Sequence, residues 1–297
     1  THSPMDQSKH EFENGLFRTA LELSKARLSI LVVWTTATGA IAAQGENHPF
    51  QWKTLLLTVA GTAVAAAAAS VLNQVLEAHR DAQMERTEQR PIPRGAIGQR
   101  AAWLLGLGLT TTSIVLLWPV GRWPLWLAMG TIALYAAVYT PLKPLTSLNT
   151  LVGAVVGAVP PMIGWAAVRG EVDGGAWVLA GILFVWQIPH FLALAWMYRD
   201  DYARGGFQML PAVDPDGVLT SRATLIGSLA LIPVSLSAFL AGFAGPFYAA
   251  MALICGLLMV VRSLRMLAEP TRETARGVFL SSLLHLPLTL GALATGW

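Results

Sequence analysis

The chain has 297 residues, of which 54% are hydrophobic and 12% are charged. Soluble domains carry roughly 25% charged residues, so this composition is typical of a protein that lies largely within a membrane. The net charge of +3 is small and fits membrane topology and contact with anionic lipid, not nucleic-acid binding. The single cysteine, Cys255, lies in an apolar run, which excludes a disulfide framework and a cysteine metal site.

Residues 1–25 are polar and charged, unlike a cleaved signal peptide, and we assign residues 1–27 to a cytoplasmic N-terminal segment. Their apolar and basic side chains recur at helical spacing, which predicts an amphipathic helix on the cytoplasmic surface of the membrane. The apolar positions are Leu16, Ala20, Leu23 and Leu28, and the basic ones are Arg18, Lys25 and Arg27.

Apolar stretches of about 18–22 residues recur along the rest of the chain, each long enough to cross a bilayer as a helix. The predicted spans are 28–45, 54–76, 101–119, 124–141, 149–168, 176–198, 223–243, 246–267 and 277–296. The sequence therefore predicts an all-α, polytopic membrane protein in which residues 28–297 form one domain of nine transmembrane helices.

The distribution of basic residues orients these helices. If the N-terminus is cytoplasmic, all of the 20 Lys and Arg residues fall on that side except Lys53, Arg122 and Arg169. Cytoplasmic loops are enriched in Lys and Arg, so the sequence predicts a cytoplasmic N-terminus and a C-terminus on the opposite side of the membrane.

The segment NQVLEAHRDAQMERTEQRPIPRG, residues 73–95, places ionisable side chains at the end of an apolar helix. Asn73, Glu77 and Asp81 are spaced by four residues, so on a helix each turns about 40° from the last and all three share one face. Oxygen ligands in such a row suit Mg²⁺, which commonly works with bound phosphates.

Arginines follow this row directly, at Arg86, Arg90 and Arg94. Arginine is the side chain that best matches phosphate geometry. Carboxylates followed by guanidinium groups at a membrane surface predict a site for a metal-bound pyrophosphate.

A second acidic segment reads WQIPHFLALAWMYRDDYARGGFQMLP. On one continuous helix His190 and Asp201 would lie about 20° from the same face, with Asp200 about 100° further round. Asp200 and Asp201 could supply ligands for a second cation, or for the same cation from the opposite side of the bundle. The alternatives are an acidic pair in solvent and, for His190, a hydrogen-bonded core histidine.

Lys143 is the only charge in the loop TPLKPLTSLN and follows the aromatic pair Tyr135 and Tyr139. It either neutralises a phosphate or follows the preference for positive charge on the cytoplasmic side. All three polar loops are cytoplasmic in the predicted topology, so we expect them to meet at the mouth of one cavity.

Three segments together resemble the protoheme IX farnesyltransferases, the heme-modifying branch of the UbiA superfamily of intramembrane prenyltransferases. They are NQVLEAHRDAQMERTEQRPIPRG, YTPLKPLTSLNTLVGAVVGAVPPMIGW and PHFLALAWMYRDDYARGGFQMLP. The resemblance runs from about Leu21 to the last helix. It implies a nine-helix UbiA-type bundle in the plasma (inner) membrane of a bacterium, with a cavity open toward the cytoplasm and the bilayer.

The resemblance also implies a reaction and its participants. Farnesyl diphosphate would alkylate a vinyl group of protoheme IX, water would add, and heme O and diphosphate would leave. Asn73, Glu77, Asp81, Asp200 and Asp201 would be the catalytic residues that hold Mg²⁺. The expected substrate-binding residues are Arg86, Arg90, Lys143, Tyr139, Asn149 and His190. Membrane lipid and a downstream heme A-forming enzyme are further expected partners.

Two departures from the superfamily pattern bear on these roles. The second acidic motif commonly reads DxxxD, but Met197 stands where its first aspartate would be. His190 replaces another aspartate, so we expect it to contact the porphyrin.

Two other functions stay open: a UbiA-type prenyltransferase that acts on a quinone precursor or another aromatic acceptor, and a non-catalytic carrier of heme or isoprenoid.

Overall fold

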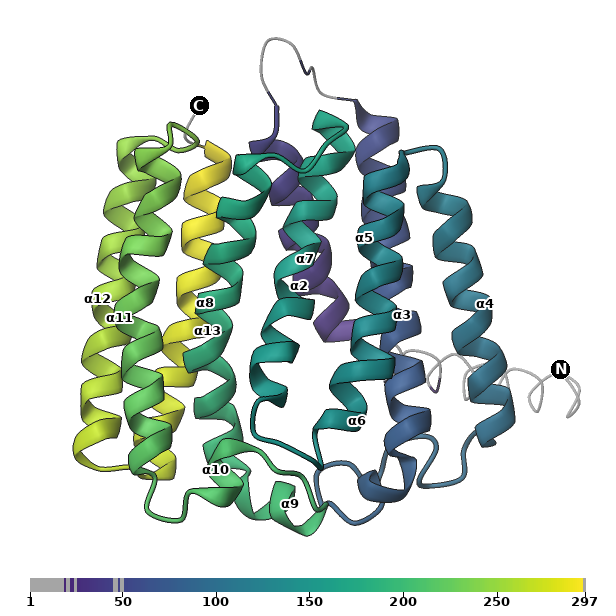
Figure 1. Cartoon of the computed structure of the whole chain (residues 1–297), viewed down its shortest axis with the longest axis vertical. Helices are drawn as coiled ribbons and strands as arrows, with labels where there is room; N and C mark the ends of the chain where they lie inside the picture. Colours follow the sequence, from purple (N-terminus) through teal and green to yellow (C-terminus); the bar gives the residue numbers. More distant parts are fainter. Residues whose placement is uncertain (1–18, 20–21, 24–25, 45–47, 49–50, 296–297) are drawn as a thin grey trace, which may run out of the picture.

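Helices build the described part of the computed structural model, which comprises residues 19, 22–23, 26–44, 48 and 51–295. The long helices lie side by side along one direction (Figure 1). They are α2 (Ala26–Ala42), α3 (Trp52–Asp81), α4 (Gln99–Leu117), α5 (Arg122–Ala133), α7 (Asn149–Arg169), α8 (Gly174–Met197), α11 (Val218–Leu240), α12 (Pro246–Ala268) and α13 (Arg272–Thr295). The short ones are the π-helix η1 (Leu134–Tyr139), α6 (Thr140–Leu142), α9 (Arg199–Arg204) and α10 (Leu210–Val213).

The predicted membrane architecture is confirmed. Within the described residues, 8 helices are long and apolar enough to cross a bilayer, counting α5, η1 and α6 as one continuous span. The apolar part of α2, Ile30–Ala42, is shorter and supplies the ninth helix. Large apolar side chains such as Leu104, Trp118 and Leu240 are exposed on the outside of the bundle, where lipid would cover them.

Two helix ends differ from the sequence-based boundaries in ways that matter for function. The predicted span 54–76 continues as helix to Asp81, so Asn73, Glu77 and Asp81 do share one helix. By contrast, α8 ends at Met197, because Tyr198 leaves the helical region with φ −120° and ψ 23°. The prediction that His190 and Asp201 share a helical face is therefore wrong, since the two residues lie on different helices.

Close packing between helices depends on glycine. A Cβ atom at Gly164 of α7 would collide with the backbone carbonyl of Thr36 on α2, and one at Gly39 of α2 would collide with the carbonyl of Pro161. Small residues let membrane helices approach this closely and gain dispersion contacts. The closely packed helices α2 and α7 thus lie in the middle of the bundle. On one side of them are α3 and α4, and on the other are α8, α11, α12 and α13 (Figure 1).

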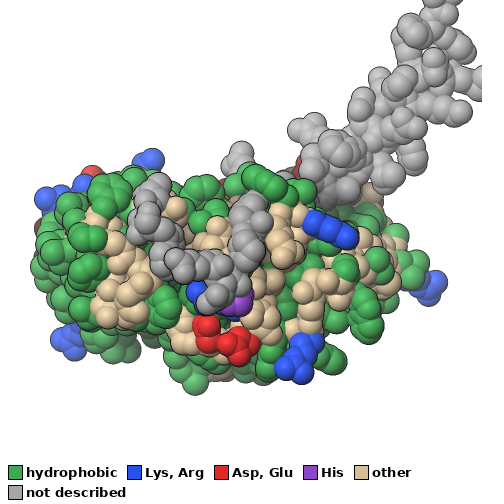
Figure 2. Space-filling view, turned by 90° about the horizontal axis from the view of Figure 1, so that it is seen from above, with side chains coloured by type: hydrophobic (Ala, Val, Ile, Leu, Met, Phe, Trp, Pro, Cys, Tyr) green, Lys and Arg blue, Asp and Glu red, His purple; other side chains and the backbone are tan. Residues whose placement is uncertain are grey.

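The loops with the polar motifs, residues 82–98, 143–148 and 198–217, all lie at one end of the bundle, the lower end in Figure 1. We call this the motif end. Figure 2 looks onto the opposite end, where charged side chains are few and scattered. The predicted amphipathic helix falls largely outside the described residues. Of its apolar positions Leu23 is buried, and its carbonyl accepts hydrogen bonds from Ser70 and Gln74 of α3.

Candidate active site

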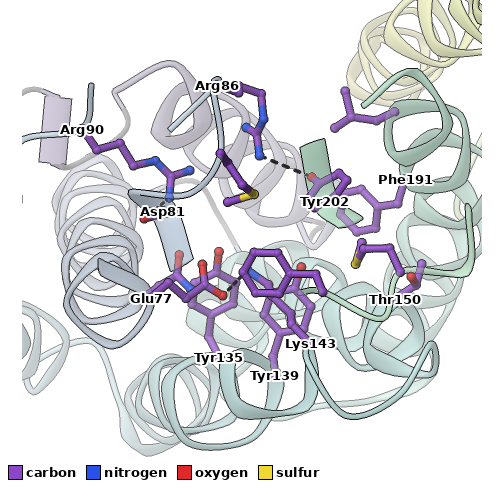
Figure 3. A pocket seen from close by; sticks show the side chains of 15 residues that line it. Glu77, Asp81, Arg86, Arg90, Tyr135, Tyr139, Lys143, Thr150, Phe191 and Tyr202 are labelled. Carbon is purple, nitrogen blue, oxygen red and sulfur yellow. Dashed lines mark hydrogen bonds and ion pairs between the residues drawn. The ribbon is translucent and has the colours of Figure 1, made fainter. Parts of the chain in front are cut away.

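A cavity of about 160 Å³ lies at the motif end, between α3, η1 and α8 (Figure 3). Its walls combine the first acidic row, the basic residues that follow it, and aromatic side chains. Most of the residues predicted for the site line it, namely Asn73, Glu77, Asp81, Arg86, Arg90, Tyr139 and Lys143. The prediction that the three polar loops meet at one cavity is confirmed, since Tyr202, Phe207 and Met209 of the third loop also line it.

Asn73 is oriented by a hydrogen bond across the bundle. Its Nδ2 donates to Thr140 Oγ1 over 3.0 Å, and Thr140 in turn donates to the carbonyl of Tyr135. Asn73 Oδ1 is buried and has no hydrogen-bond partner within the described part of the chain. A buried acceptor without a donor is costly, so this oxygen is suited to a cation.

Both carboxylates of the row form ion pairs with basic residues of the cavity. Glu77 Oε1 lies 2.7 Å from Lys143 Nζ, and Asp81 Oδ2 lies 2.6 Å from Arg90 NH1. The side chains of Glu77 and Lys143 are only 5% and 12% exposed. Burial alone would lower the pKa of Lys143, but the Glu77 carboxylate more than offsets this, and the net pKa is raised. The lysine is therefore charged at neutral pH.

The aromatic wall arises from a π-helix. The π turn at Leu134–Tyr139 interrupts the span Arg122–Leu142 and brings Tyr135 and Tyr139 into a stack, with ring centroids 5.1 Å apart. The ammonium group of Lys143 lies 4.6 Å from the centroid of the Tyr139 ring. Such π turns are rare and occur frequently at functional sites.

Arg86 is held at the rim of the cavity by α9 and the end of α8. Its guanidinium carbon lies 5.5 Å from the ring centroids of both Tyr198 and Tyr202, and its NH2 group donates to the Tyr202 hydroxyl over 3.4 Å. Aromatic faces attract guanidinium groups, so the two tyrosines restrict where Arg86 can point.

Asp201 fixes the backbone that carries Arg86. Its Oδ1 accepts from the amide of Glu85 at 2.9 Å and its Oδ2 from the amide of Arg86 at 3.3 Å. Arg204 donates to Oδ1 at 2.8 Å. Burial raises the pKa of Asp201, but the hydrogen bonds from Arg204 and from the two amides lower it by a larger amount. The net pKa therefore lies below its ordinary value.

The second acidic segment reaches this cavity through Phe191, Leu194, Tyr202, Phe207 and Met209, but its two carboxylates do not line it. Asp200 points outward with its side chain 89% exposed, and both Asp200 and Asp201 line a separate cavity beside Arg204 and Arg272. Among the described residues, no group of three or more His, Cys, Asp or Glu is placed to hold a metal ion. A cation at the first motif would have one amide and two carboxylate ligands, which suits Mg²⁺ bound together with phosphate oxygens.

The sequence profile of the UbiA prenyltransferase family matches residues 32–285. The chain belongs to this family. Among its relatives, the protoheme IX farnesyltransferase of Solibacter usitatus is 41% identical over 284 residues, which cover 92% of this chain and 97% of that one. The protoheme IX farnesyltransferase of Opitutus terrae is 42% identical over 283 residues, 94% of this chain and 95% of that one. The mitochondrial enzyme of Homo sapiens is 41% identical over 90% of this chain and 60% of its own.

Solved structures share the fold of this UbiA-family chain. A structure of digeranylgeranylglyceryl phosphate synthase superposes with a TM-score of 0.78 at 18% identity, covering 94% of this chain and 98% of that one. A UbiA homolog from Archaeoglobus fulgidus, bound to GPP and Mg²⁺, superposes with a TM-score of 0.67 at 13% identity, covering 93% and 99%. The nine-helix bundle inferred from hydropathy is therefore the UbiA fold.

Two residues predicted to bind substrate lie outside this cavity of the UbiA-family bundle. Asn149 is buried, and its Nδ2 donates to the carbonyls of Thr146 and Gln208, so it ties two loops together. His190 packs between the rings of Trp186 and Phe279, at 4.8 and 4.9 Å between centroids.

Several residues that line the cavity were not predicted from the sequence. They are Met84, Tyr135, Thr150, Phe191, Leu194, Tyr202, Phe207 and Met209. Tyr202 had a detectable signal, because it directly follows the acidic pair. The others are apolar, aromatic or hydroxyl side chains in hydrophobic or loop segments, and only the folded arrangement distinguishes them from ordinary packing residues.

Proposed function

We propose that this chain transfers a farnesyl group from farnesyl diphosphate to a vinyl group of protoheme IX, giving heme O and diphosphate. The observation that carries this proposal is the cavity in which Asn73, Glu77 and Asp81 face Lys143 and Arg90, on a chain about 40% identical to protoheme IX farnesyltransferases. A cavity with this mixture of charge suits a metal-bound diphosphate, and a carrier of apolar ligands has no need of it.

The bonds change as follows. The allylic C–O bond of farnesyl diphosphate breaks, and its electron pair stays on the diphosphate oxygen. The allylic cation forms a carbon–carbon bond with the terminal vinyl carbon of the porphyrin. Water then adds its oxygen to the other vinyl carbon and releases one proton. Sheltering the cation from water until the new carbon–carbon bond forms is the task of the protein.

The residues of the cavity divide this work. Lys143, Arg86 and Arg90 bind the phosphates and stabilise the charge that develops on the leaving group. Asn73, Glu77 and Asp81 would hold Mg²⁺, which supplies additional positive charge at the leaving group. Because Glu77 and Asp81 pair with Lys143 and Arg90, the buried charges balance before substrate binds. The rings of Tyr135, Tyr139 and Phe207 present π faces that favour a cation.

We assign the porphyrin to the side of the bundle that contains His190. Ser282 Oγ donates its only proton to the carbonyl of Phe279, so it accepts from His190 Nδ1 at 2.7 Å. This bond fixes the orientation and the tautomer of the imidazole, with its proton on Nδ1. Replacement of His190 by Ala should weaken porphyrin binding and leave farnesyl diphosphate binding unchanged. Equal loss of both affinities would contradict this assignment.

The direct test is product analysis. The purified protein in lipid vesicles receives farnesyl diphosphate, Mg²⁺ and either protoheme IX or a hydroxybenzoate quinone precursor, and products are identified by mass spectrometry. We expect heme O from protoheme and no prenylated hydroxybenzoate. Prenylation of the hydroxybenzoate alone would assign the chain to another acceptor. Farnesyl diphosphate that stays intact in both reactions would favour a carrier.

The role of the first motif is tested in the same assay. Removal of Mg²⁺ with a chelator should abolish turnover, and added Mg²⁺ should restore it. Asp81→Asn removes the charge while keeping the shape, and we expect a loss of at least about 100-fold in rate, as for other groups that stabilise a leaving group. Glu88→Gln, an exposed change in the following loop, is the control. Near-normal turnover by Asp81→Asn would overturn the metal site.

The protein is an integral membrane protein. We propose that it resides in the plasma (inner) membrane of a bacterium with the motif end in the cytoplasm. Contact with a downstream heme A-forming enzyme stays a prediction, and co-purification with such an enzyme from membranes would test it.

A further inference from the structure

A porphyrin needs more room than the diphosphate cavity offers. That cavity measures about 160 Å³, whereas sites for drug-sized ligands usually measure about 300–1,000 Å³. Two larger cavities open beside it at the motif end, one of about 520 Å³ and one of about 640 Å³. The larger of the two lies where the end of α8 meets the start of α13.

The lining of the 640 Å³ cavity combines an apolar wall with two positive charges. Arg272 and Arg276 are one turn apart on α13 and therefore lie on the same face. One acidic residue, Glu273, accompanies them. The apolar and aromatic wall consists of Met197, Tyr198, Phe279 and Leu280. A flat apolar ring that carries two carboxylates matches this set of side chains, because arginine pairs with carboxylates through two parallel hydrogen bonds.

We propose that Arg272 and Arg276 bind the two carboxylates of the porphyrin substrate, and that the 640 Å³ cavity is the acceptor site. The inference rests on the proposed function and adds to it the position and the orientation of the bound acceptor.

The aromatic wall is held in place from behind. The Phe279 ring stacks on the His190 ring, with centroids 4.9 Å apart and planes 28° apart. The Trp186 ring also stacks on the His190 ring, and the indole Nε1 donates a hydrogen bond to the carbonyl of Ser282. The same group of side chains thus fixes both Phe279 and the imidazole, which favours a preformed surface for a planar ligand.

The acceptor cavity and the diphosphate cavity are linked through the residues that each shares with the 520 Å³ cavity. Met197, Tyr198 and Arg272 line both the 640 Å³ and the 520 Å³ cavities, and Arg86 lines both the 520 Å³ and the diphosphate cavities. Arg272 and Arg86 both lie against the ring of Tyr198, with guanidinium carbons 6.0 and 5.5 Å from its centroid.

This arrangement orients the acceptor. In protoheme IX the vinyl groups lie on the half of the macrocycle away from the carboxylates. If Arg272 and Arg276 hold the carboxylates, the vinyl half extends past Tyr198 toward Arg86 and the diphosphate. The allylic carbon and the vinyl carbon can then meet near Arg86, as the reaction requires.

Porphyrin fluorescence tests the proposal without depending on turnover. Metal-free protoporphyrin IX and its dimethyl ester, whose carboxylates are blocked, are titrated into the full-length protein in lipid nanodiscs. In the double variant Arg272→Gln/Arg276→Gln, we expect affinity for protoporphyrin IX to fall by about tenfold or more, as loss of charge-assisted hydrogen bonds predicts. Affinity for the dimethyl ester should not change.

The matched control is Arg262→Gln/Arg265→Gln, which removes the same charge from α12 at the same end of the bundle. If this control weakens protoporphyrin IX binding as much as the α13 variant does, the attraction is general and the proposed contacts are wrong. An α13 variant that binds both porphyrins as the wild type does would also overturn the proposal. Retained farnesyl diphosphate binding shows that the variants are folded. If the wild type binds farnesyl diphosphate but no porphyrin, the acceptor in the proposed function fails as well.

Discussion

Asp200 and Asp201 are adjacent in sequence but lie in opposite surroundings. Asp201 is buried and accepts hydrogen bonds from two backbone amides and from Arg204, while Asp200 is exposed beside Arg199. Three of the about four lone-pair sites of this carboxylate are already used, so Asp201 is poorly placed to coordinate a metal. The geometry indicates that Asp201 positions Arg86 through the backbone of the loop.

We therefore predict different effects for two conservative variants. Asp201→Asn replaces one acceptor oxygen with an NH2 group that faces a backbone donor, so we expect a KM for farnesyl diphosphate raised by about tenfold, equivalent to one lost charge-assisted hydrogen bond. Asp200→Asn should leave KM unchanged. Steady-state kinetics at saturating Mg²⁺ measures both, and hydrogen exchange of the amides of Glu85 and Arg86 should accelerate in Asp201→Asn alone.

The Mg²⁺ dependence of the rate distinguishes a positioning role for Asp201 from a role as a metal ligand. If Asp201 were a metal ligand, the Mg²⁺ concentration for half-maximal rate would rise in Asp201→Asn while hydrogen exchange of the loop amides stayed slow.

The lowered pKa of Asp201 also predicts a dependence of loop stability on pH. Its contribution to loop stability is present above the ordinary aspartate pKa of about 4 and is lost as pH falls through the lowered value.

At the scale of elements, the α2–α7 crossing depends on the absence of side chains. A Cβ atom at Gly164 would collide with the carbonyl of Thr36 and lie 2.8 Å from the backbone nitrogen of Ala40. Backbone atoms cannot move aside as a flexible side chain can. Gly164→Ala should therefore cost about 1–3 kcal/mol, as other overpacking substitutions do, and lower the Tm of the purified protein.

Gly130 provides the matched control. It lies within α5, and a Cβ atom there would meet nothing within 4 Å. Gly130→Ala should keep or raise the Tm, since alanine favours helix over glycine. Thermal unfolding in detergent compares the two variants. Equal destabilisation would show that helix crossing distance does not limit stability at Gly164.

At the scale of the whole molecule, the fold places the motif loops at one end of the bundle and short connectors at the other. In a background where Cys255 is replaced by Ala, single cysteines at Gln89 and Glu171 should label from opposite sides of the membrane. Gln89 is exposed in a motif loop, and Glu171 is exposed between α7 and α8. We expect an impermeant reagent added to intact cells to modify the Glu171→Cys variant only. Modification of both variants from outside would contradict the predicted topology.

The sequence by itself determined the features that depend on local geometry. Hydropathy over about 20 residues reports a membrane span, because the bilayer core has a fixed thickness. A row spaced by four residues shares a helical face wherever the helix lies, and for this reason Asn73, Glu77 and Asp81 were correctly grouped. The motif loops, with their basic residues and Lys143, could be assigned to one side from charge alone.

Only the tertiary structure decided which groups meet across long sequence separations. The two backbone amides that donate to Asp201 lie more than 100 residues earlier in the chain, and the end of α8 at Met197 separates Asp201 from His190. No local pattern reports such contacts, since they depend on how the helices cross. The π turn that aligns Tyr135 with Tyr139 likewise depends on packing against α3, where Asn73 bonds Thr140. Spacing in the sequence thus places a side chain on one face of its helix, but the packing of the bundle determines its partner.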